Sequence, residues 1–314
     1  MSAASGASGP EVPNGSAGAG GPGVAEGSGS GRARLQVARP RLAPRAWLGI
    51  AFTALLLACA LAAPWLAPHD PLDQDLVSAS LPPAWVAGGE AAHWFGTDGL
   101  GRDILSRLVW GARPALVVAV AGALAAGLIG TALGLAAGFL GGRTDAAVSR
   151  LVDVWMAFPA VLLAIVLVAI VGAGLGAVVL AIALIDWTRF CRVVRAEAMR
   201  QARMDYVVAA RTIGLTRAQT LVREVLPNVA PLLATLFTLE MGVAVVVEAI
   251  LSFVGLSVST DMPTWGGLIR EGRLYVNQTP WLLALPVAAI AASVLAFNAL
   301  GDGLRDSLDP VLSR

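Results

Sequence analysis

Two glutamates inside one long apolar run are the first candidates for chemistry in this sequence. Glu240 and Glu248 lie in the run from about Val229 to Leu251, eight residues and therefore about 80° apart around a helix. Ionisable side chains at membrane depth cost free energy and are often functional, and a carboxylate pair could carry protons or cations. Glu248 has an alternative interpretation without a transport role: it lies near the outer end of the run, where water or a loop can hydrogen-bond its carboxylate. Glu240 and Glu248 are therefore a candidate intramembrane polar site.

The histidines and cysteines are too few and too scattered along the chain to predict a metal centre. His69 and His93 lie outside the apolar runs, and no other His or Cys is close to either in the sequence, which predicts no zinc site. Cys59 and Cys191 lie in or beside different apolar runs, as buried free thiols do. His93 and Asp98 could take part in catalysis or metal binding. We favour the other interpretation, in which their segment is a folded loop outside the membrane. We expect this chain to bind no metal and no cofactor.

The basic residues exclude one large class of enzyme. All 22 of them are arginine, and a phosphate-binding P-loop needs a lysine on the nucleotide phosphates. The sequence also lacks the G-x-S-x-G and H-E-x-x-H patterns of hydrolases. The net charge of +1 creates no field that would attract nucleic acid. We therefore expect a protein that is not an enzyme, with any ATP and Mg²⁺ chemistry in a separate subunit.

The composition predicts an integral membrane protein. The chain is 57% hydrophobic and only 14% charged over 314 residues. Residues 1–45 form a leader that is first rich in Gly, Ala and Ser, and hence expected to be disordered, and then basic. A cleaved signal peptide is the alternative, but the apolar run 46–66 is long enough to span a membrane and the leader is long for a signal. Residues 46–314 are then one transmembrane domain.

Six membrane spans are expected in that domain, at about 46–66, 114–140, 154–171, 174–188, 229–251 and 281–300. The run from 154 to 187 is too long for one comfortable span, and the glycines of 172–176 allow a hairpin. Two spans there keep the arginine-rich loop 189–228 on the same side as both chain ends. Because arginines concentrate on the cytoplasmic side, both termini are predicted to be cytoplasmic.

The polar segments between spans have their own expected structure. Before the second span we expect a Pro-rich stretch, turns at Gly96 and Gly99, and an interfacial helix capped by Asp98 or Asp103. Within the second span, the pairs Gly122–Ala126 and Gly130–Gly134 would let another helix approach closely.

The loop 189–228 carries eight arginines and predicts a rigid projection. A helix is expected from about Ala196 to Thr212, ending at Gly214, where positive φ costs nothing. Thr216 and Gln219 have capping-box spacing, which starts a second short helix. Two short helices joined at a glycine form a knob that a soluble partner could grip.

This loop resembles the EAA loop of bacterial ABC-importer permeases. Ala209, Ala210, Gly214, Leu226 and Pro227 match that pattern in type and spacing, whereas Val208 replaces its Glu and Glu224 its Ile. Three further stretches resemble the second, C-type permease subunit of the dipeptide/oligopeptide/nickel family. They are HWFGTDGLGRD at 93–103, EAILSFVGL at 248–256, and the tail at 296–310.

The resemblance implies an all-α polytopic protein with the type I ABC-importer permease fold and a cytoplasmic coupling helix, in the bacterial inner membrane. It implies a second homologous permease, two ABC ATPase subunits that use ATP and Mg²⁺, and an extracytoplasmic substrate-binding protein. Closure of the ATPases would pull on the knob and rock the helices. We expect these roles: Gly214 shapes the knob, Met204 and Val207 pack into a cleft on the ATPase, and Arg203 and Arg211 make rim contacts, beside the matched Ala209 and Ala210.

Peptides are the first choice of substrate, and a nickel or metal-chelate importer is the alternative within the family. From another class, an ion-coupled secondary transporter would use Glu240 and Glu248, and inverted repeats would support it, but the two halves show no convincing repeat. A structural membrane assembly factor would transport nothing.

Overall fold

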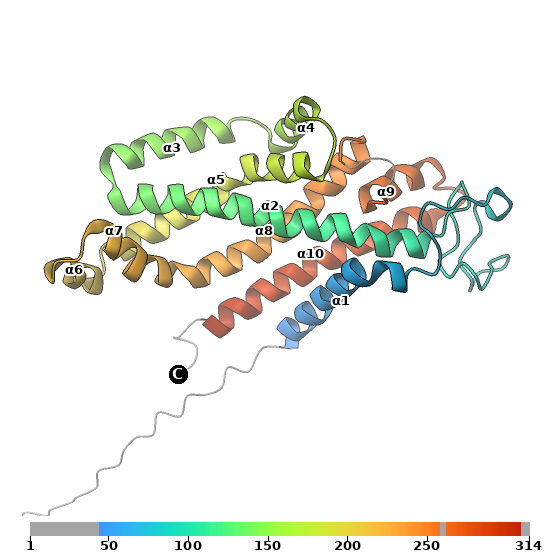
Figure 1. Ribbon diagram of the computed structural model, residues 1–314, viewed down its shortest axis with the longest axis horizontal. Helices are drawn as coiled ribbons and strands as arrows, with labels where there is room; N and C mark the ends of the chain where they lie inside the picture. Colours follow the sequence, from blue (N-terminus) through green and yellow to red (C-terminus); the bar gives the residue numbers. More distant parts are fainter. Residues whose placement is uncertain (1–43, 258–261, 309–314) are drawn as a thin grey trace, which may run out of the picture. The chain divides into compact units, whose positions relative to one another are not determined.

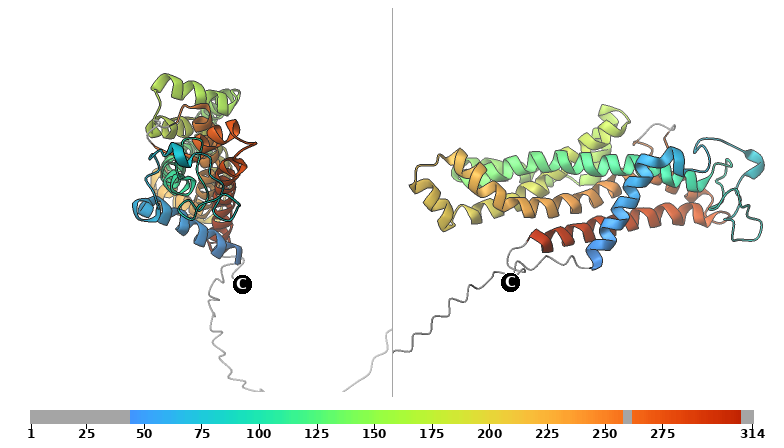
Figure 2. Two further views of the ribbon diagram at one scale, coloured as in Figure 1. Left: turned by 90° about the vertical axis from the view of Figure 1, so that its right-hand side faces the viewer. Right: turned by 60° about the horizontal axis from the view of Figure 1, so that its bottom comes forward.

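A computed structural model describes residues 44–257 and 262–308, so the expected disorder of the leader lies outside the described residues. Within these ranges every regular element is a helix, and the one isolated β-bridge joins Thr97 to Asp103. Figure 1 shows the helices as a bundle, with α6 and α7 at one end and the segment 67–103 with α9 at the other. Figure 2 shows the same arrangement from two further sides.

Four helices are long and apolar enough to cross a membrane. They are α1 (Pro44–Leu66), α2 (Ile104–Leu140), α8 (Leu226–Val254) and α10 (Pro280–Leu308). Two shorter helices, α3 (Gly142–Met156) and α4 (Ala160–Val171), meet at 85° and can together count as one more span. The described residues thus contain four or five such elements, and the predicted six spans are not confirmed.

The helix α5 (Leu175–Gln201) explains part of this difference. Its first eleven residues, 175–185, are apolar, but Asp186, Arg189 and Arg192 follow at once. Before it, α4 ends at Val171, and Gly172 and Gly174 turn the chain with φ of 102° and 150°. The predicted hairpin at 172–176 is therefore present, and the amide of Gly174 donates to the carbonyl of Ser257 at 2.6 Å.

The start of α2 differs from the expectation. The predicted interfacial helix and the predicted second span form one helix of 37 residues that runs through Pro114. Of the two candidate caps, Asp103 is the N-cap, and its side chain accepts from the amide of Ser106 at 2.7 Å. Residues on both sides of Pro114 are buried in the bundle, so tertiary packing outweighs the helix-breaking tendency of proline.

Close contact between α2 and α5 depends on glycine, as the small residues predict. A Cβ atom on Gly134 would lie 2.7 Å from the carbonyl oxygen of Cys191, and one on Gly138 would lie 2.8 Å from the Cβ of Ala198. Gly130 meets the α5 backbone in the same way. The backbones of α2 and α5 are therefore too close for any side chain at these positions. Cys191 is a buried free thiol in this contact, and Cys59 a half-buried one.

At the opposite end, α9 (Trp265–Leu274) packs on the first turns of α2. The indole nitrogen of Trp265 donates to the carbonyl of Leu108 at 3.0 Å, and Gly111 leaves the space that the ring occupies. This contact places α9 beside the segment 67–103.

Candidate functional site

The arginine-rich loop does not begin with the single helix expected for 196–212. The helix α5 ends at Gln201, a turn follows, and α6 (Asp205–Thr212) starts after its N-cap residue Met204. Side-chain hydrogen bonds hold this turn: Gln201 Nε2 donates to Glu197 at 2.7 Å, and the hydroxyl of Tyr206 donates to Gln201. Ala, Met and Arg favour helix continuation, so side-chain hydrogen bonds between near neighbours hold a turn where helix propensity alone predicts none.

Glu197 is the centre of these hydrogen bonds. Arg200 donates to both of its carboxylate oxygens, with distances of 2.9 and 2.6 Å, and Gln201 adds a third bond. The hydrogen bond from Arg200, followed by that from Gln201, lowers the pKa of the Glu197 carboxyl. The ionised carboxylate therefore stabilises the turn that leads into α6.

The far end of α6 agrees with the sequence prediction. Gly214 has a φ of 98°, and the amide of Leu215 donates to the carbonyl of Ala210 at 3.1 Å, which caps the helix. The predicted capping box of Thr216 and Gln219 starts α7 (Arg217–Thr220). A π-helical turn, η2 (Leu221–Val225), then leads into α8, with Pro227 in its first turn.

One face of α6 belongs to the core of this chain. Val207 is fully buried and Ala210 is 6% exposed. Val207 joins a hydrophobic cluster with residues from four other elements: Leu135, Phe139, Val194, Ala198, Val225 and Val229. The side chain of Val207 thus anchors α6 to the bundle and is not accessible for the expected contact with a partner.

Other apolar side chains of α6 and its two ends are open to solvent. Val208 is 53% exposed and Ile213 is 79% exposed, while Met204 is half-buried. Exposed apolar side chains on an otherwise polar projection indicate a contact surface. Sequence reasoning chose Met204 and Val207 as the contact residues and missed Val208 and Ile213, because the sequence alone does not show which side of this helix faces the bundle.

The remaining candidates of the loop lie beside these open side chains. Arg203 and Ala209 are exposed. Arg211 is exposed too, but its guanidinium lies over the ring of Phe139, 4.9 Å from the centroid, so it also braces α6 against the end of α2. We name the surface formed by Arg203, Val208, Ala209 and Ile213 the α6 outer face.

The two glutamates of α8 have separate surroundings. Glu240 is 4% exposed, and its Oε2 lies 3.9 Å from Nη1 of Arg189 on α5. Arg189 also lies 3.7 Å from Asp186, so the two side chains form an ion pair at the end of the apolar stretch of α5. Oε1 of Glu240 is buried and has no hydrogen-bond partner within the described part of the chain.

Glu248 is held by the neighbouring loop. It is 1% exposed, and its Oε1 accepts from Ser252 at 2.5 Å and from Ser257 at 3.1 Å. Eight residues of helix separate it from Glu240 by about 12 Å along the axis. The structure therefore supports the local role for Glu248 and does not join the two glutamates into one site.

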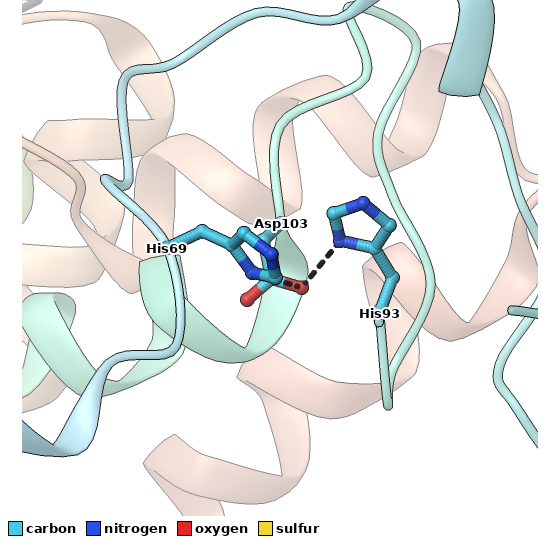
Figure 3. Close-up of side chains that lie close together, drawn as sticks. All are labelled: His69, His93 and Asp103. Atoms are coloured by element: carbon cyan, nitrogen blue, oxygen red, sulfur yellow. Dashed lines mark hydrogen bonds and ion pairs between the residues drawn. The ribbon is translucent and has the colours of Figure 1, made fainter. Parts of the chain in front are cut away.

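At the other end of the bundle, the charged side chains of the segment 93–103 belong to two separate groups, one around Asp98 and one around Asp103. Asp98 accepts from Arg102 and Arg107, and both arginines also reach Glu271 on α9. His93 pairs with Asp103 at 3.0 Å and not with Asp98, the partner in the alternative that the sequence analysis did not favour. His69 lies beside it (Figure 3). The sequence places the two histidines 24 residues apart, so nothing in their spacing predicts this contact.

Comparisons with known proteins agree with the membrane-spanning helices of this chain. The family model described as "Binding-protein-dependent transport system inner membrane component" matches residues 130–314. A second model, "N-terminal TM domain of oligopeptide transport permease C", matches residues 41–83.

Several curated proteins are similar over most of their length. The chain is 41% identical over 264 residues to the di/tripeptide transport system permease protein DppC of Pseudomonas aeruginosa (strain UCBPP-PA14), which covers 84% of this chain and 87% of the relative. It is 38% identical over 262 residues to the glutathione transport system permease protein GsiD of Shigella dysenteriae serotype 1 (82% and 84%). It is 34% identical over 269 residues to the oligopeptide transport system permease protein OppC of Bacillus subtilis (strain 168) (86% of each). With more than half of its length matched by the first model, this chain belongs to the binding-protein-dependent transport system inner membrane components, the membrane-embedded permease subunits of ABC importers.

Proposed function

We propose that this chain is one of two permease subunits that form the path of an ATP-driven peptide importer, and that α6 is its coupling helix. The importer would include a second permease, two ATPase subunits and an extracytoplasmic binding protein. The α6 outer face carries the proposal, because it combines exposed apolar side chains with a rigid attachment to the bundle.

Peptides are the substrate class that the relatives support best. The names of the three relatives given above assign di- and tripeptides, glutathione and oligopeptides to them. All of these compounds are peptides, whereas a nickel or chelate substrate has no comparable support here.

The proposed coupling follows from the two faces of α6. Val208 and Ile213 would enter a cleft on an ATPase subunit, with Arg203 at the rim. Val207 would pass any displacement of α6 to α2, α5 and α8 through the shared hydrophobic cluster, and Ala210 is buried beside it. ATP-driven closure of the ATPases would then move the helices between outward- and inward-facing states.

The proposed contact of α6 with the ATPases also fixes the orientation of the chain in the membrane. Arginines gather at the end that carries α6: Arg143, Arg150, Arg192, Arg195, Arg200, Arg203, Arg211, Arg217 and Arg223. That end would be cytoplasmic by the positive-inside rule. The segment 67–103 and α9 would then lie outside, where a binding protein docks, and α4 and α5 would complete a six-span topology.

Arg189 indicates where the path runs. Its side chain is 52% exposed at the end of the apolar part of α5, next to the buried carboxylates of Asp186 and Glu240. Exposure of a guanidinium to lipid hydrocarbon is costly, so charged groups at such depth face a bundle interior or a water-filled cavity. We infer that this side of α5 faces the second permease or the substrate path.

An ion-coupled carrier is not favoured. Such a mechanism would use Glu240 and Glu248 together, but each is engaged by its own neighbours. An ionophore provides the test between the two classes: uptake should continue while cellular ATP is high and should fail when ATP is depleted.

The coupling role is tested with matched valine substitutions. The chain is coexpressed with its partner permease and ATPases, and Val208→Arg is compared with Val77→Arg, which places the same charge on an exposed valine at the opposite end. We expect Val208→Arg to lose the ATPase subunits on purification and Val77→Arg to retain them. Ile213→Arg should behave like Val208→Arg. Normal co-purification and normal substrate-stimulated ATP hydrolysis in both α6 variants would contradict the assignment of the coupling helix.

The substrate is tested separately. Cells that depend on this chain should take up a labelled dipeptide in an ATP-dependent manner, and unlabelled glutathione or a longer peptide should compete if either is also carried. Uptake of a nickel chelate without peptide uptake would replace the peptide assignment but leave the ABC-importer assignment intact.

A further inference from the structure

The two histidines of the chain meet at one buried carboxylate, although they come from different parts of the segment 67–103. Figure 3 shows His69, from the stretch after α1, and His93 next to Asp103, the N-cap of α2. Nδ1 of His93 lies 3.0 Å from Oδ1 of Asp103, and Nδ1 of His69 lies 3.9 Å from the same oxygen. The ring centroids are 4.6 Å apart.

These distances fit the ligand sphere of a metal ion. One atom from each of the three side chains can be chosen so that all lie within 4.8 Å of one another. Tetrahedral coordination with bonds of about 2.1 Å places ligand atoms about 3.4 Å apart. The two measured distances to Asp103 lie on either side of that value. The side chain of His69 is the more exposed of the two histidines, 37% against 13%, and a small rotation of its ring would complete the geometry.

The cluster has two features that hydrogen bonding alone leaves unexplained. Nδ1 of His69 is buried and has no hydrogen-bond partner among the residues that the structure describes. The carboxylate of Asp103 is 1% exposed, and its charged partners within the same residues are the two histidines rather than an arginine. A metal ion between these atoms would add a positive charge beside the buried carboxylate and give Nδ1 of His69 its missing partner.

The carboxylate is also held in place, as metal ligands usually are. Oδ2 of Asp103 accepts from the amide and the hydroxyl of Ser106 at 2.7 and 2.6 Å, which leaves Oδ1 directed at the histidines. The same hydroxyl accepts from the backbone amide of His69 at 3.0 Å. The carbonyl of His93 accepts from the amide of Gly96 at 2.8 Å. Such outer contacts orient the ligands and fix their geometry.

We propose that His69, His93 and Asp103 bind one divalent first-row transition metal ion, with water or another small donor in the remaining coordination position. Two imidazole nitrogens and one carboxylate oxygen suit Zn²⁺ and its neighbours rather than Mg²⁺ or Ca²⁺, which prefer all-oxygen sites. The ion would tie the end of α1 and the loop around His93 to the first turn of α2. This site does not depend on the transported substrate or on the coupling role of α6.

The test uses the full chain, purified in mild detergent with an affinity tag that contains no histidine. The protein is treated with a chelator, dialysed, and titrated with Zn²⁺; Co²⁺ serves as a visible-absorption probe of the ligand set. We expect one Zn²⁺ per chain, a higher unfolding temperature with Zn²⁺ than without it, and Co²⁺ absorption bands typical of nitrogen and oxygen ligands.

Three variants locate the ion. His69→Gln, His93→Gln and Asp103→Asn should each weaken Zn²⁺ binding at least tenfold. Asn keeps the helix cap at position 103, so the last variant separates metal binding from capping. The control Glu90→Gln removes an exposed carboxylate of the same segment and should bind Zn²⁺ like the wild type.

Two results would overturn the proposal. One is the absence of saturable Zn²⁺ or Co²⁺ binding by the wild-type chain, which would leave the cluster as a hydrogen-bonded brace. The other is binding that survives unchanged in His93→Gln and Asp103→Asn, which would place the ion elsewhere. Unfolding temperatures of all variants in the presence of chelator show whether each remains folded, so that a loss of binding is not mistaken for a loss of structure.

Discussion

Arg107 on α2 donates both terminal guanidinium nitrogens to the carboxylate of Glu271 on α9, with Nη1–Oε2 and Nη2–Oε1 distances of 2.6 and 3.1 Å. The two residues are 164 positions apart, and the Arg107 side chain is 5% exposed. Asp98 and Arg102 extend the pair into a network of four charges. The network fastens α9 to the first turns of α2 and to the loop before it.

Removing Glu271 should therefore destabilise this end of the protein. Loss of one partner of a largely buried, bidentate ion pair leaves excess positive charge on Arg107 and Arg102, and we expect Glu271→Ala to cost about 3 kcal/mol. Thermal unfolding in mild detergent measures the loss. The control Glu90→Ala removes an exposed carboxylate from the neighbouring loop. If the two variants unfold at the same temperature, the network does not hold α9.

A single methyl group should disturb the contact between α2 and α5. In Gly134→Ala the new Cβ would meet the carbonyl oxygen of Cys191 at 2.7 Å, and relief of that contact requires the helices to separate. Overpacking of this kind costs about 1–3 kcal/mol. Gly176→Ala is the matched control, because no atom lies within 4 Å of a Cβ there. Equal unfolding temperatures for both variants would show that the two backbones can separate without loss.

Substitutions at two adjacent valines should distinguish an effect on the stability of the fold from an effect on coupling to the ATPase. Val207→Ala removes buried methyl groups from the cluster beneath α6 and should cost about 2 kcal/mol. Val208→Ala removes exposed ones and should leave the unfolding temperature unchanged, but it should lower substrate-stimulated ATP hydrolysis in the assembled complex. The assignment of the two faces fails if Val208→Ala is the destabilising variant.

The turn before α6 should weaken in acid. The pKa of Glu197 is lowered from its ordinary value of 4.5, so the folded state favours the ionised carboxylate. This contribution is fully present above pH 4.5 and is lost as the pH falls through the lowered value. Arg200 is 57% exposed, so the contribution should stay below about 1 kcal/mol.

Comparison with Glu197→Gln isolates this effect from other titrations. The wild-type chain should unfold at a higher temperature than the variant at pH 7, and the difference should shrink at progressively lower pH below 4.5. A difference that grows toward acid pH would mean that the bonds to Arg200 and Gln201 do not stabilise the turn.

The local features of the loop 189–228 were predictable because short-range chemistry determines them. Gly214 ends α6 since a residue without Cβ tolerates its φ of 98°, and Thr216 with Gln219 forms a capping box at fixed spacing. The hairpin at 172–176 follows in the same way from its glycines. In each case the residues that decide the structure are neighbours in the sequence.

The features that sequence reasoning missed depend on contacts between distant residues. Helix propensity does not separate α5 from α6, because the residues around Ala202 favour a continuous helix. The hydrogen bonds of Gln201 and the packing of Val207 against α2 and α8 favour the break. The pairing of His69 with His93 likewise exists only once α1 and α2 lie side by side. The hydrophobic periodicity of the sequence also does not predict that α2 continues through Pro114, because the burial of the surrounding residues in the bundle keeps this part helical.

The unbroken length of α2 limits how this protein can evolve. Its first residue follows the capping carboxylate of Asp103, and near its last turn Phe139 lies under the guanidinium of Arg211, about 55 Å away for 37 residues. One inserted or deleted residue would rotate everything beyond it by about 100° and shift it by about 1.5 Å. The glycines that face α5 would then turn away, and the two ends of the helix would lose register with each other. We therefore expect that relatives differ in the length of the segment 67–103 but keep the spacing between Asp103 and Phe139 constant.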